Sequence, residues 1–441
     1  MQPDILHNLN SSIATPQTEE AYAGFVEEFH TPRARTESNY SEAMRIVKVI
    51  RERQLPFPLT RYFMTIEAVK AAFQLLKTYA PAWEEMSHNE MKGHGSSLWL
   101  PSVFRGKGRQ FVGKRGDWWR LDVIIDYFTE LERVTAKKDY RQSVMDAWHD
   151  DKILCNTVML CAKKKVVNCQ SLRDNLFFNV RELSLFRVTR TKALIQMIFF
   201  NDETNQSMAQ CKGLRWLDIS AGWGDRLMVA CALEMDYLGF DPNQGLADGH
   251  QEMITMFGQF YPTEEAKSSE EKTPRQRVLY QPFETDVSRL LIEADVAVHG
   301  LFDVSLVSPP FYIIERYSGC GQSTDSYPEF NDWMVNFLFV SLYNTWQNLK
   351  EGGFLAINIA NIRNCDIVGP MQLFIEDFLV GCQWEGLLTF SGKGTKNSPG
   401  IVYVWRKDSS LPSVLWKPEL HRRLSKSFPH LHSKWSRRSK Q

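Results

Sequence analysis

The segment from Leu214 to Pro242 constrains the fold more than any other part of the chain. A short apolar run, Trp216–Ile219, ends at a Ser-Ala-Gly-Trp-Gly turn, which leads into a segment whose apolar residues recur at helical spacing. A second apolar run, Tyr237–Phe240, ends at Asp241. Strand, tight glycine turn, helix and strand are the parts of a βαβ unit, so the segment predicts an α/β fold.

The turn and the acid after the second strand indicate a cofactor that carries a nucleoside. Backbone N–H groups after Gly222 would face an anionic ligand at the N-terminus of the helix. Asp241 follows Asp218 by about twenty residues, where a carboxylate can accept hydrogen bonds from ribose hydroxyls. A dinucleotide site needs Gly-x-Gly-x-x-Gly, and Leu227 stands where its third glycine would be. The turn therefore predicts a nucleoside ligand without a pyrophosphate, although it could also be a plain strand–helix corner.

The turn resembles motif I of the class I S-adenosylmethionine (SAM) methyltransferases. Their usual pattern is Asp-x-Gly-x-Gly-x-Gly, and Ser220 replaces its first glycine here. Such a turn holds a methionine carboxylate rather than two phosphates. The resemblance implies SAM as the cofactor, held by Asp218, Ser220, Gly222, Gly224 and Asp241.

A third expected strand, Val278–Tyr280, precedes two further cofactor candidates. In methyltransferases of this class, the residues after that strand border the adenine of the cofactor. The resemblance implies that Phe283 packs on the adenine ring and that Glu284 accepts a hydrogen bond from its amino group. A loop with a core phenylalanine is the competing interpretation.

The chemical motif is Ser308-Pro309-Pro310-Phe311, which ends the buried strand Phe302–Val307. An exocyclic amine on adenine or cytosine is a poor nucleophile because its lone pair is delocalised into the ring. Acceptors that hold the N–H bonds out of the ring plane restore the lone pair, and the Ser308 hydroxyl and the Pro309 carbonyl can be two such acceptors. The prolines stiffen the turn, and Phe311 can stack on an extruded or single-stranded base.

This tetrapeptide matches the Asp/Asn/Ser-Pro-Pro-aromatic signature of amino-methyltransferases that act on nucleic-acid bases. Its place at a strand end, roughly ninety residues after the glycine turn, makes an accidental match improbable. Methylation at cytosine C5 is argued against, because that reaction needs a cysteine in a Pro-Cys motif. Cys320 is too far downstream to serve.

Further segments resemble the DNA methylases of bacteriophages and large DNA viruses, over about residues 120–406. The resemblance implies DNA as the substrate, with adenine N6 favoured over cytosine N4. The same chemistry on RNA, or an inactive nucleic-acid-binding scaffold, are the alternatives. The matching segments include Asp-Tyr-Phe-Thr-Glu (126–130), Phe-Arg-Val-Thr-Arg-Thr-Lys-Ala-Leu (186–194), Ile-Ser-Ala-Gly-Trp-Gly-Asp-Arg-Leu (219–227), Gly-Phe-Asp-Pro-Asn (239–243), Glu-Arg-Tyr-Ser (315–318) and Leu-Lys-Glu-Gly-Gly-Phe-Leu-Ala-Ile-Asn-Ile-Ala-Asn (349–361).

A basic segment between Phe104 and Arg120 alternates cations with glycines and aromatic residues. Glycines let a loop approach a phosphate backbone, cations neutralise it, and an aromatic ring can stack on an unpaired base. We expect nucleic-acid contact here, and a basic surface loop whose aromatics fold into the core is the alternative. The candidate residues are Arg105, Lys107, Arg109, Lys114, Arg115 and Trp118.

The chain divides into four expected parts. Residues 1–38 are a polar arm expected to be disordered, and residues 39–195 are a mainly helical domain that helps to hold the substrate. Residues 196–408 are the methyltransferase domain, expected as a Rossmann-like, mostly parallel seven-stranded sheet that ends in an antiparallel hairpin. Residues 409–441 form a basic tail.

Composition is that of an ordinary globular protein, with 43% apolar and 24% charged residues and a formal net charge of zero. No apolar run approaches the ~20 residues of a membrane span. The eight cysteines contain no Cys-x-x-Cys pair, so neither a metal site nor a disulfide framework is expected. The N-terminus lacks the basic and apolar regions of a signal peptide, which predicts an intracellular protein, cytoplasmic or nuclear. The oligomeric state stays open.

Overall fold

Two compact units make up the chain, and each combines segments that are distant in the sequence. The first comprises Met1–Ala72, Val123–Ser184 and Glu315–Ser318, and the second Phe73–Asp122, Leu185–Ile314 and Gly319–Gln441. The structure is a computed structural model that describes residues 38–86, 107–112, 119–138, 141–163, 168–180, 183, 185–200, 211–261, 273–319, 321–362, 365–389 and 400–409. The expected arm, apart from Ser38, and the expected basic tail, apart from Ser409, lie outside these residues.

These units divide the chain differently from the predicted domains. The prediction assigned residues 39–195 to one helical domain, whereas residues 73–122 and 185–195 belong to the unit that contains the sheet. The physical reason is that two strands and one helix from this stretch pack with the sheet unit, which helical periodicity alone does not reveal.

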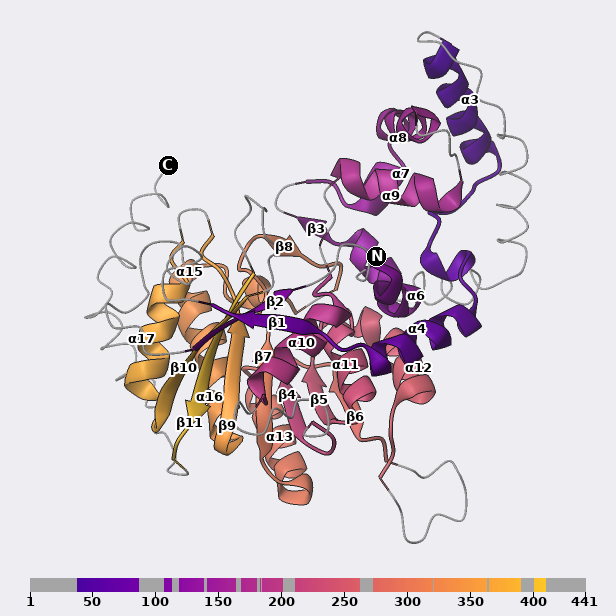
Figure 1. The fold of residues 1–441 in the computed structure, drawn as a ribbon. Helices are drawn as coiled ribbons and strands as arrows, with labels where there is room; N and C mark the ends of the chain where they lie inside the picture. Colours follow the sequence, from indigo (N-terminus) through magenta and orange to yellow (C-terminus); the bar gives the residue numbers. More distant parts are fainter. Residues whose placement is uncertain are drawn as a thin grey trace, which may run out of the picture. The chain divides into compact units, whose positions relative to one another are not determined.

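The second unit is built on a sheet with the strand order β1-β2-β10-β11-β9-β7-β4-β5-β6 (Figure 1). Neighbouring strands from β6 to β9 are parallel, and β11 is antiparallel to both β9 and β10. The seven strands are β4 (Arg215–Asp218), β5 (Asp236–Phe240), β6 (Gln276–Leu279), β7 (Phe302–Val307), β9 (Leu349–Asn358), β10 (Cys382–Thr389) and β11 (Ile401–Lys407). The predicted Rossmann-like arrangement of these seven strands is confirmed, but their antiparallel hairpin β10–β11 does not form an end of the sheet, because β2 pairs with β10.

Two additional strands extend the sheet beyond β10. They are β1 (Ala82–Glu85) and β2 (Lys107–Val112), which pair antiparallel to each other, and β2 runs parallel to β10. Neither strand was predicted: β2 lies in the basic segment interpreted as a nucleic-acid-binding or surface loop, whose cations and glycines mask the short apolar pattern of a strand.

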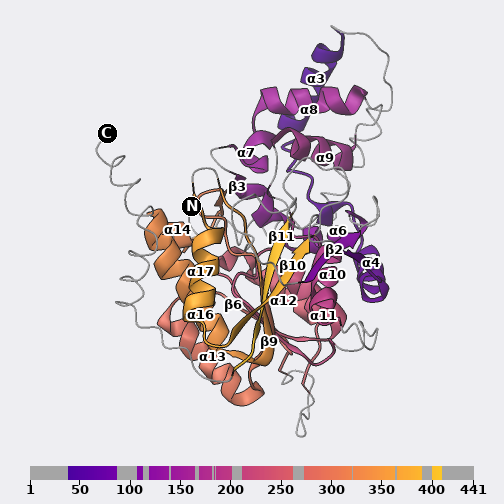
Figure 2. The same ribbon diagram turned by 60° about the vertical axis from the view of Figure 1, so that its left-hand side comes forward.

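Helices cover both faces of the sheet (Figure 2). One layer contains α10 (Val188–Ile198), α11 (Asp225–Leu233) and α12 (Ala247–Phe257). The other contains α13 (Asp286–His299), α16 (Val340–Gln347) and α17 (Val368–Phe378), together with α14 (Ser323–Ser326), α15 (Phe330–Asp332) and the π-helical turn η4 (Trp333–Phe339). The short 3-10 turn η2 (Gln244–Leu246) precedes α12.

The core of this unit explains why the central strands are so apolar. Every residue of β4 and of β5 is buried, as expected for parallel strands covered on both faces. The large buried side chains of Trp346 and Phe374 join strand residues such as Leu217 and Leu355 in one cluster. The carboxyl ends of the central strands are therefore held by a closely packed frame.

The first unit is helical and has a core of its own. Its core residues come from α3 (Ser38–Glu52), α7 (Val144–Trp148), α8 (Asp151–Lys163) and α9 (Cys169–Val180), with contributions from the end of α6 (Trp119–Thr135) and the segment around η1 (Thr60–Tyr62). The strands β3 (Lys137–Lys138) and β8 (Glu315–Arg316) pair within this unit. One of the points where the chain passes between the two units falls inside α4 (Ile66–Thr78), and another falls inside α6.

A buried ionic cluster accompanies the core of the first unit. The Arg173 guanidinium lies 2.6 Å from carboxylate oxygens of both Asp126 and Glu130, and it packs on the ring of Phe177. Glu130 also accepts a 2.6 Å hydrogen bond from the backbone N–H of Thr60. The charged groups of this cluster are paired with one another, as buried charges require.

In the part of the chain that the structure describes, no helix is long and apolar enough to cross a membrane.

Candidate active site

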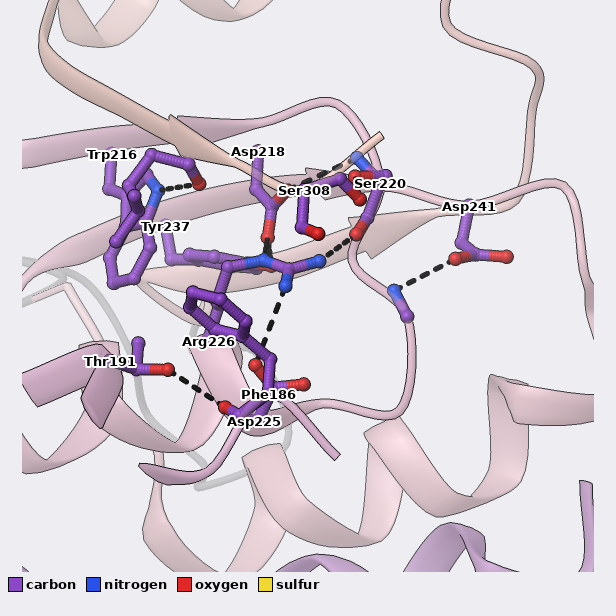
Figure 3. Close-up of polar contacts among 12 residues, drawn as sticks. Phe186, Thr191, Trp216, Asp218, Ser220, Asp225, Arg226, Tyr237, Asp241 and Ser308 are labelled. Atoms are coloured by element: carbon purple, nitrogen blue, oxygen red, sulfur yellow. Dashed lines mark hydrogen bonds and ion pairs between the residues drawn. The ribbon is translucent and has the colours of Figure 1, made fainter. Parts of the chain in front are cut away.

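The predicted cofactor turn and the predicted chemical motif lie at the same edge of the sheet. The strand order β7-β4-β5 and their parallel pairing place the carboxyl ends of these three strands side by side. The glycine turn follows β4, Asp241 follows β5, and Ser308 follows β7 (Figure 3). The Ser220 hydroxyl donates a 3.0 Å hydrogen bond to the backbone carbonyl of Ser308, so the two motifs are in direct contact.

Backbone hydrogen bonds couple the turn to Asp241. The N–H of Gly222 donates to one carboxylate oxygen of Asp241 at 2.8 Å, and the N–H of Asn243 donates to the other at 2.9 Å. Gly222 has a φ of +60° and Gly224 a φ of +94°, a region that favours glycine. The tight turn thus fixes the orientation of the Asp241 carboxylate.

Asp241 is partly exposed, and each of its oxygens keeps lone-pair capacity beyond one backbone N–H. Burial raises the pKa of this carboxyl to about 6, against the opposing effect of the two backbone N–H groups. An ionised carboxylate held in this way can accept from two further donors. That is the chemistry of a site for a pair of adjacent hydroxyls.

Arg226 is the centre of a buried network that shapes the turn, and sequence reasoning missed it (Figure 3). Its Nε donates to Asp218 at 2.6 Å, another nitrogen donates to the Ser220 carbonyl, and a third lies 3.4 Å from Asp225. Burial works against the charged form, yet the carboxylates of Asp218 and Asp225 raise the pKa of Arg226. The available signal was the pair Asp225 and Arg226 at the start of a helix whose remaining residues are apolar.

Asp218 does not have the exposure that the prediction of cofactor binding requires. Its side chain is fully buried, and its carboxylate accepts from the Ser220 N–H, from Arg226 and from the Tyr237 hydroxyl at 2.7 Å. Because these donors occupy it, Asp218 shapes the turn rather than contacting a ligand. This corrects the sequence-based assignment. Tyr237 carried no sequence signal, since an aromatic residue is ordinary in a buried strand.

His250 supports the same turn from α12. It is buried, its Nε2 lies 3.0 Å from the Gly222 carbonyl, and its Nδ1 lies 3.1 Å from the Tyr280 hydroxyl. Since a carbonyl only accepts, Nε2 carries the hydrogen and Nδ1 accepts from Tyr280. Burial lowers the pKa of His250 to about 4, so the ring is neutral at physiological pH.

The two residues predicted to border adenine behave differently. Phe283 is buried in the core, with its ring 5.1 Å from that of Phe240 in an edge-to-face contact. It therefore belongs to the core, which corrects its assignment as a cofactor contact. Glu284 is only partly buried, but its Oε2 is enclosed without a hydrogen-bond partner among the described residues, and burial raises the pKa of its carboxyl. An enclosed oxygen without a donor fits a site that a ligand amine completes.

The Ser308–Phe311 corner is rigidly held. Pro309 is buried, and Phe311 is half-buried against the core cluster. The following residue, Tyr312, has a φ of +43° and donates from its hydroxyl to the Pro328 carbonyl at 2.5 Å. Backbone strain of this kind persists only where surrounding contacts enforce it, and it often marks functional sites.

The basic segment proposed for nucleic-acid contact is only partly described. Arg109 lies on β2 and is buried, with its guanidinium donating to the Met197 carbonyl at 2.6 Å and lying over the Phe200 ring. It is therefore a structural residue, and its assignment to nucleic-acid binding is wrong. Lys107 lies on the same strand. Arg105, Lys114, Arg115 and Trp118 lie outside the described residues.

No protein-family model and no curated protein sequence matches this chain. Its likeness to TrmN from Thermus thermophilus has a TM-score of 0.31 and 16% identity, and it covers 50% of this chain and 49%, about half, of that chain. The likeness to an rRNA methylase from Streptococcus thermophilus has a TM-score of 0.28 and 10% identity, and it covers 45% of this chain and 89% of that chain. The likeness to a SAM-dependent methyltransferase from Agrobacterium tumefaciens has a TM-score of 0.30 and 11% identity, and it covers 52% of this chain and 65% of that chain. These likenesses are too weak to carry an argument, so the fold rests on the strand order itself.

Proposed function

We propose that the protein transfers a methyl group from S-adenosylmethionine to the exocyclic amine of a nucleic-acid base. The observation that carries this proposal is the contact between Ser220 and Ser308, because it joins a nucleoside-type turn to an amine-accepting corner. A methyl donor on one side of this contact and a base on the other would be neighbours.

The residues present suit this cofactor. Asp241 would accept from the two ribose hydroxyls, and the enclosed oxygen of Glu284 would accept from the adenine amino group. Gly222 and Gly224 allow the backbone to approach the methionine end. Ser220 contributes by linking the turn to Ser308.

When bound, the cofactor would supply a methyl group on a cationic sulfur, which would keep the electron pair of the C–S bond as the amine nitrogen takes the methyl group. The Ser308 hydroxyl and the Pro309 carbonyl would accept the two amine hydrogens and so aim the nitrogen lone pair. Pro310 stiffens the corner, and Phe311 would stack on the base. No strong base is required, because the nitrogen loses a proton to solvent once it has become cationic.

The substrate polymer rests on resemblance alone. Similarity to the DNA methylases of bacteriophages and large DNA viruses favours DNA and adenine N6. Incubation with methyl-labelled SAM and separate pools of DNA and RNA, followed by nucleoside mass spectrometry, identifies polymer and base together. Label only in RNA would reassign the polymer, whereas absence of SAM binding in calorimetry would favour a nucleic-acid-binding scaffold.

The chemical assignment is tested by the Ser308→Ala, Phe311→Ala double variant. We expect turnover to fall by about a hundredfold, because both the acceptor and the stacking ring are lost, with little change in SAM affinity. Ser305→Ala is the matched control, since this buried serine of β7 donates only to the Leu217 carbonyl, at 2.8 Å. Turnover of the double variant at the original rate would refute the assignment.

A further inference from the structure

We infer that Asn358 is a positioning residue that turns the hydroxyl hydrogen of Ser308 away from the substrate. This inference rests on the proposed function of Ser308 and adds the device that makes a serine serve as a dependable acceptor. The juxtaposition that supports it is a chain of two hydrogen bonds, from Ser308 to Asn358 and from Asn358 to the backbone of β11.

The position of Asn358 follows from the sheet. It is the last residue of β9, which pairs with β7 through Val307 and Ile357, so it stands beside the strand end that carries Ser308. The side chain of Asn358 is almost entirely enclosed, since the residue is 8% exposed. It is therefore held by its neighbours rather than by solvent.

The contacts of Asn358 define which end of its amide faces Ser308. The Nδ2 group donates a 2.8 Å hydrogen bond to the carbonyl of Ile401. A carbonyl can only accept, so the amide nitrogen must point to β11, which leaves Oδ1 on the other side. Oδ1 lies 3.3 Å from the Ser308 hydroxyl oxygen.

That orientation decides the role of the serine. An amide oxygen cannot donate, so the single hydroxyl hydrogen of Ser308 is directed to Asn358. The lone pairs of the Ser308 oxygen then remain for an amine hydrogen. With the opposite orientation, the hydroxyl would donate to the amine nitrogen and occupy the lone pair that must attack the methyl group. An aspartate in place of Ser308, which the signature also allows, would accept an amine hydrogen without such help.

The test is a pair of substitutions of nearly equal shape. Asn358→Asp keeps an acceptor for Ser308 but has no hydrogen to donate to Ile401, whereas Asn358→Leu has neither function. We expect Asn358→Leu to lower kcat by about tenfold with the Kd for SAM unchanged, and Asn358→Asp to stay within about threefold of the wild type. If the leucine variant does not fold, Asn358→Ala replaces it.

Two further backgrounds separate positioning from general support of the fold. In Ser308→Ala there is no hydroxyl to orient, and in Ser308→Asp the acceptor needs no orientation, so adding Asn358→Leu should cost less than about twofold in either. Asn348→Ala is the matched control, because that amide also donates to a backbone carbonyl, that of Asn344 at 2.7 Å, at the other end of β9. Its kcat should match that of the wild type.

The outcomes distinguish this inference from the proposed function. An equal loss in every Ser308 background, or a loss in Asn358→Asp as large as in Asn358→Leu, would overturn the positioning role. Wild-type protein that transfers no methyl group to any base would instead overturn the proposed function. Sensitivity to Ser308→Ala together with indifference to Asn358→Leu would leave the function standing and remove only the role of Asn358.

Discussion

Among single side chains, the Asp241 carboxylate has the clearest consequence for ligand binding. Each of its oxygens already accepts one backbone N–H, and its remaining lone pairs are those that would meet the ribose. Protonation would turn one of these acceptors into a donor. The proposed cofactor affinity therefore depends on the charge of one partly buried group.

We predict that SAM binds more weakly as pH falls through about 6, because burial raises the pKa of Asp241 to about 6. The ionised form is needed for binding and predominates above this value, so affinity should drop by about tenfold for each pH unit below it. Isothermal calorimetry between pH 5 and pH 8 measures this. Asp241→Asn is the control and should bind weakly with a flat profile; a flat profile in the wild type would contradict the prediction.

The sequence was sufficient to locate the polar residues of the site but not to assign the structural or binding role of each one. Ser308 and Asp241 stand next to strand ends, and strand order alone brings them together. Asp218 and Phe283 were misassigned, because their burial depends on the distant partners Tyr237 and Phe240. Arg109 was taken for a surface cation, because the sequence does not show that its side chain is enclosed and donates to the carbonyl of the distant Met197.

Among the secondary-structure elements, α11 depends most on the turn before it. Gly224 immediately precedes this helix with a φ of +94°, and a Cβ there would lie 2.8 Å from the Met253 sulfur and 3.1 Å from a ring carbon of His250. Backbone conformation and close packing therefore both require glycine.

We predict that Gly224→Ala lowers the free energy of unfolding by more than about 1 kcal/mol and weakens SAM binding. Chemical denaturation and calorimetry measure the two effects. Gly352→Ala is the matched control, because Gly352 has a φ of +80° with nothing within 4 Å of the added methyl. It should show the backbone cost alone, so equal destabilisation of the two variants would argue against the packing contribution.

The elements themselves were predictable where periodicity is strong. The buried strands β4, β5 and β7 were expected close to their observed bounds, and an antiparallel hairpin was expected among the last strands of the sheet. The strands β1 and β2 were not, because β1 has only four residues and pairs with β2, and β2 lies in a basic, glycine-containing segment and pairs with β10, more than two hundred residues away in the sequence. Local pattern cannot report a partner at such a distance.

For the molecule as a whole, the separation into two units has a measurable consequence. Leu154 is fully buried in the core of the first unit, whereas Leu238 is buried on β5 of the second, three residues before Asp241. All residues proposed to hold the cofactor belong to the second unit.

We predict that Leu154→Ala and Leu238→Ala each lower the free energy of unfolding by about 2 to 5 kcal/mol, because each leaves a cavity in a packed core. At a temperature where both variants are folded, only Leu238→Ala should weaken SAM binding. Denaturation followed by calorimetry on the same samples checks this. Weaker binding in Leu154→Ala would mean that the first unit also contributes to the cofactor site.

The interleaving of these units could not be derived from periodicity. Helical spacing predicts helices throughout much of residues 39–195, but it does not state which core each helix joins. The segments 73–122 and 185–195 were therefore grouped with their sequence neighbours, although their contacts are with the sheet unit.

The strand pair β1–β2 also changes how the protein can meet its own copies. Without it, the eight-residue β10 would present open N–H and C=O groups to any passing extended chain. Instead, among the residues that the structure describes, the margin is the four-residue strand β1, which carries Glu84 and Glu85. Two like-charged margins repel one another, so this side of the molecule discourages fibrous self-assembly at high concentration.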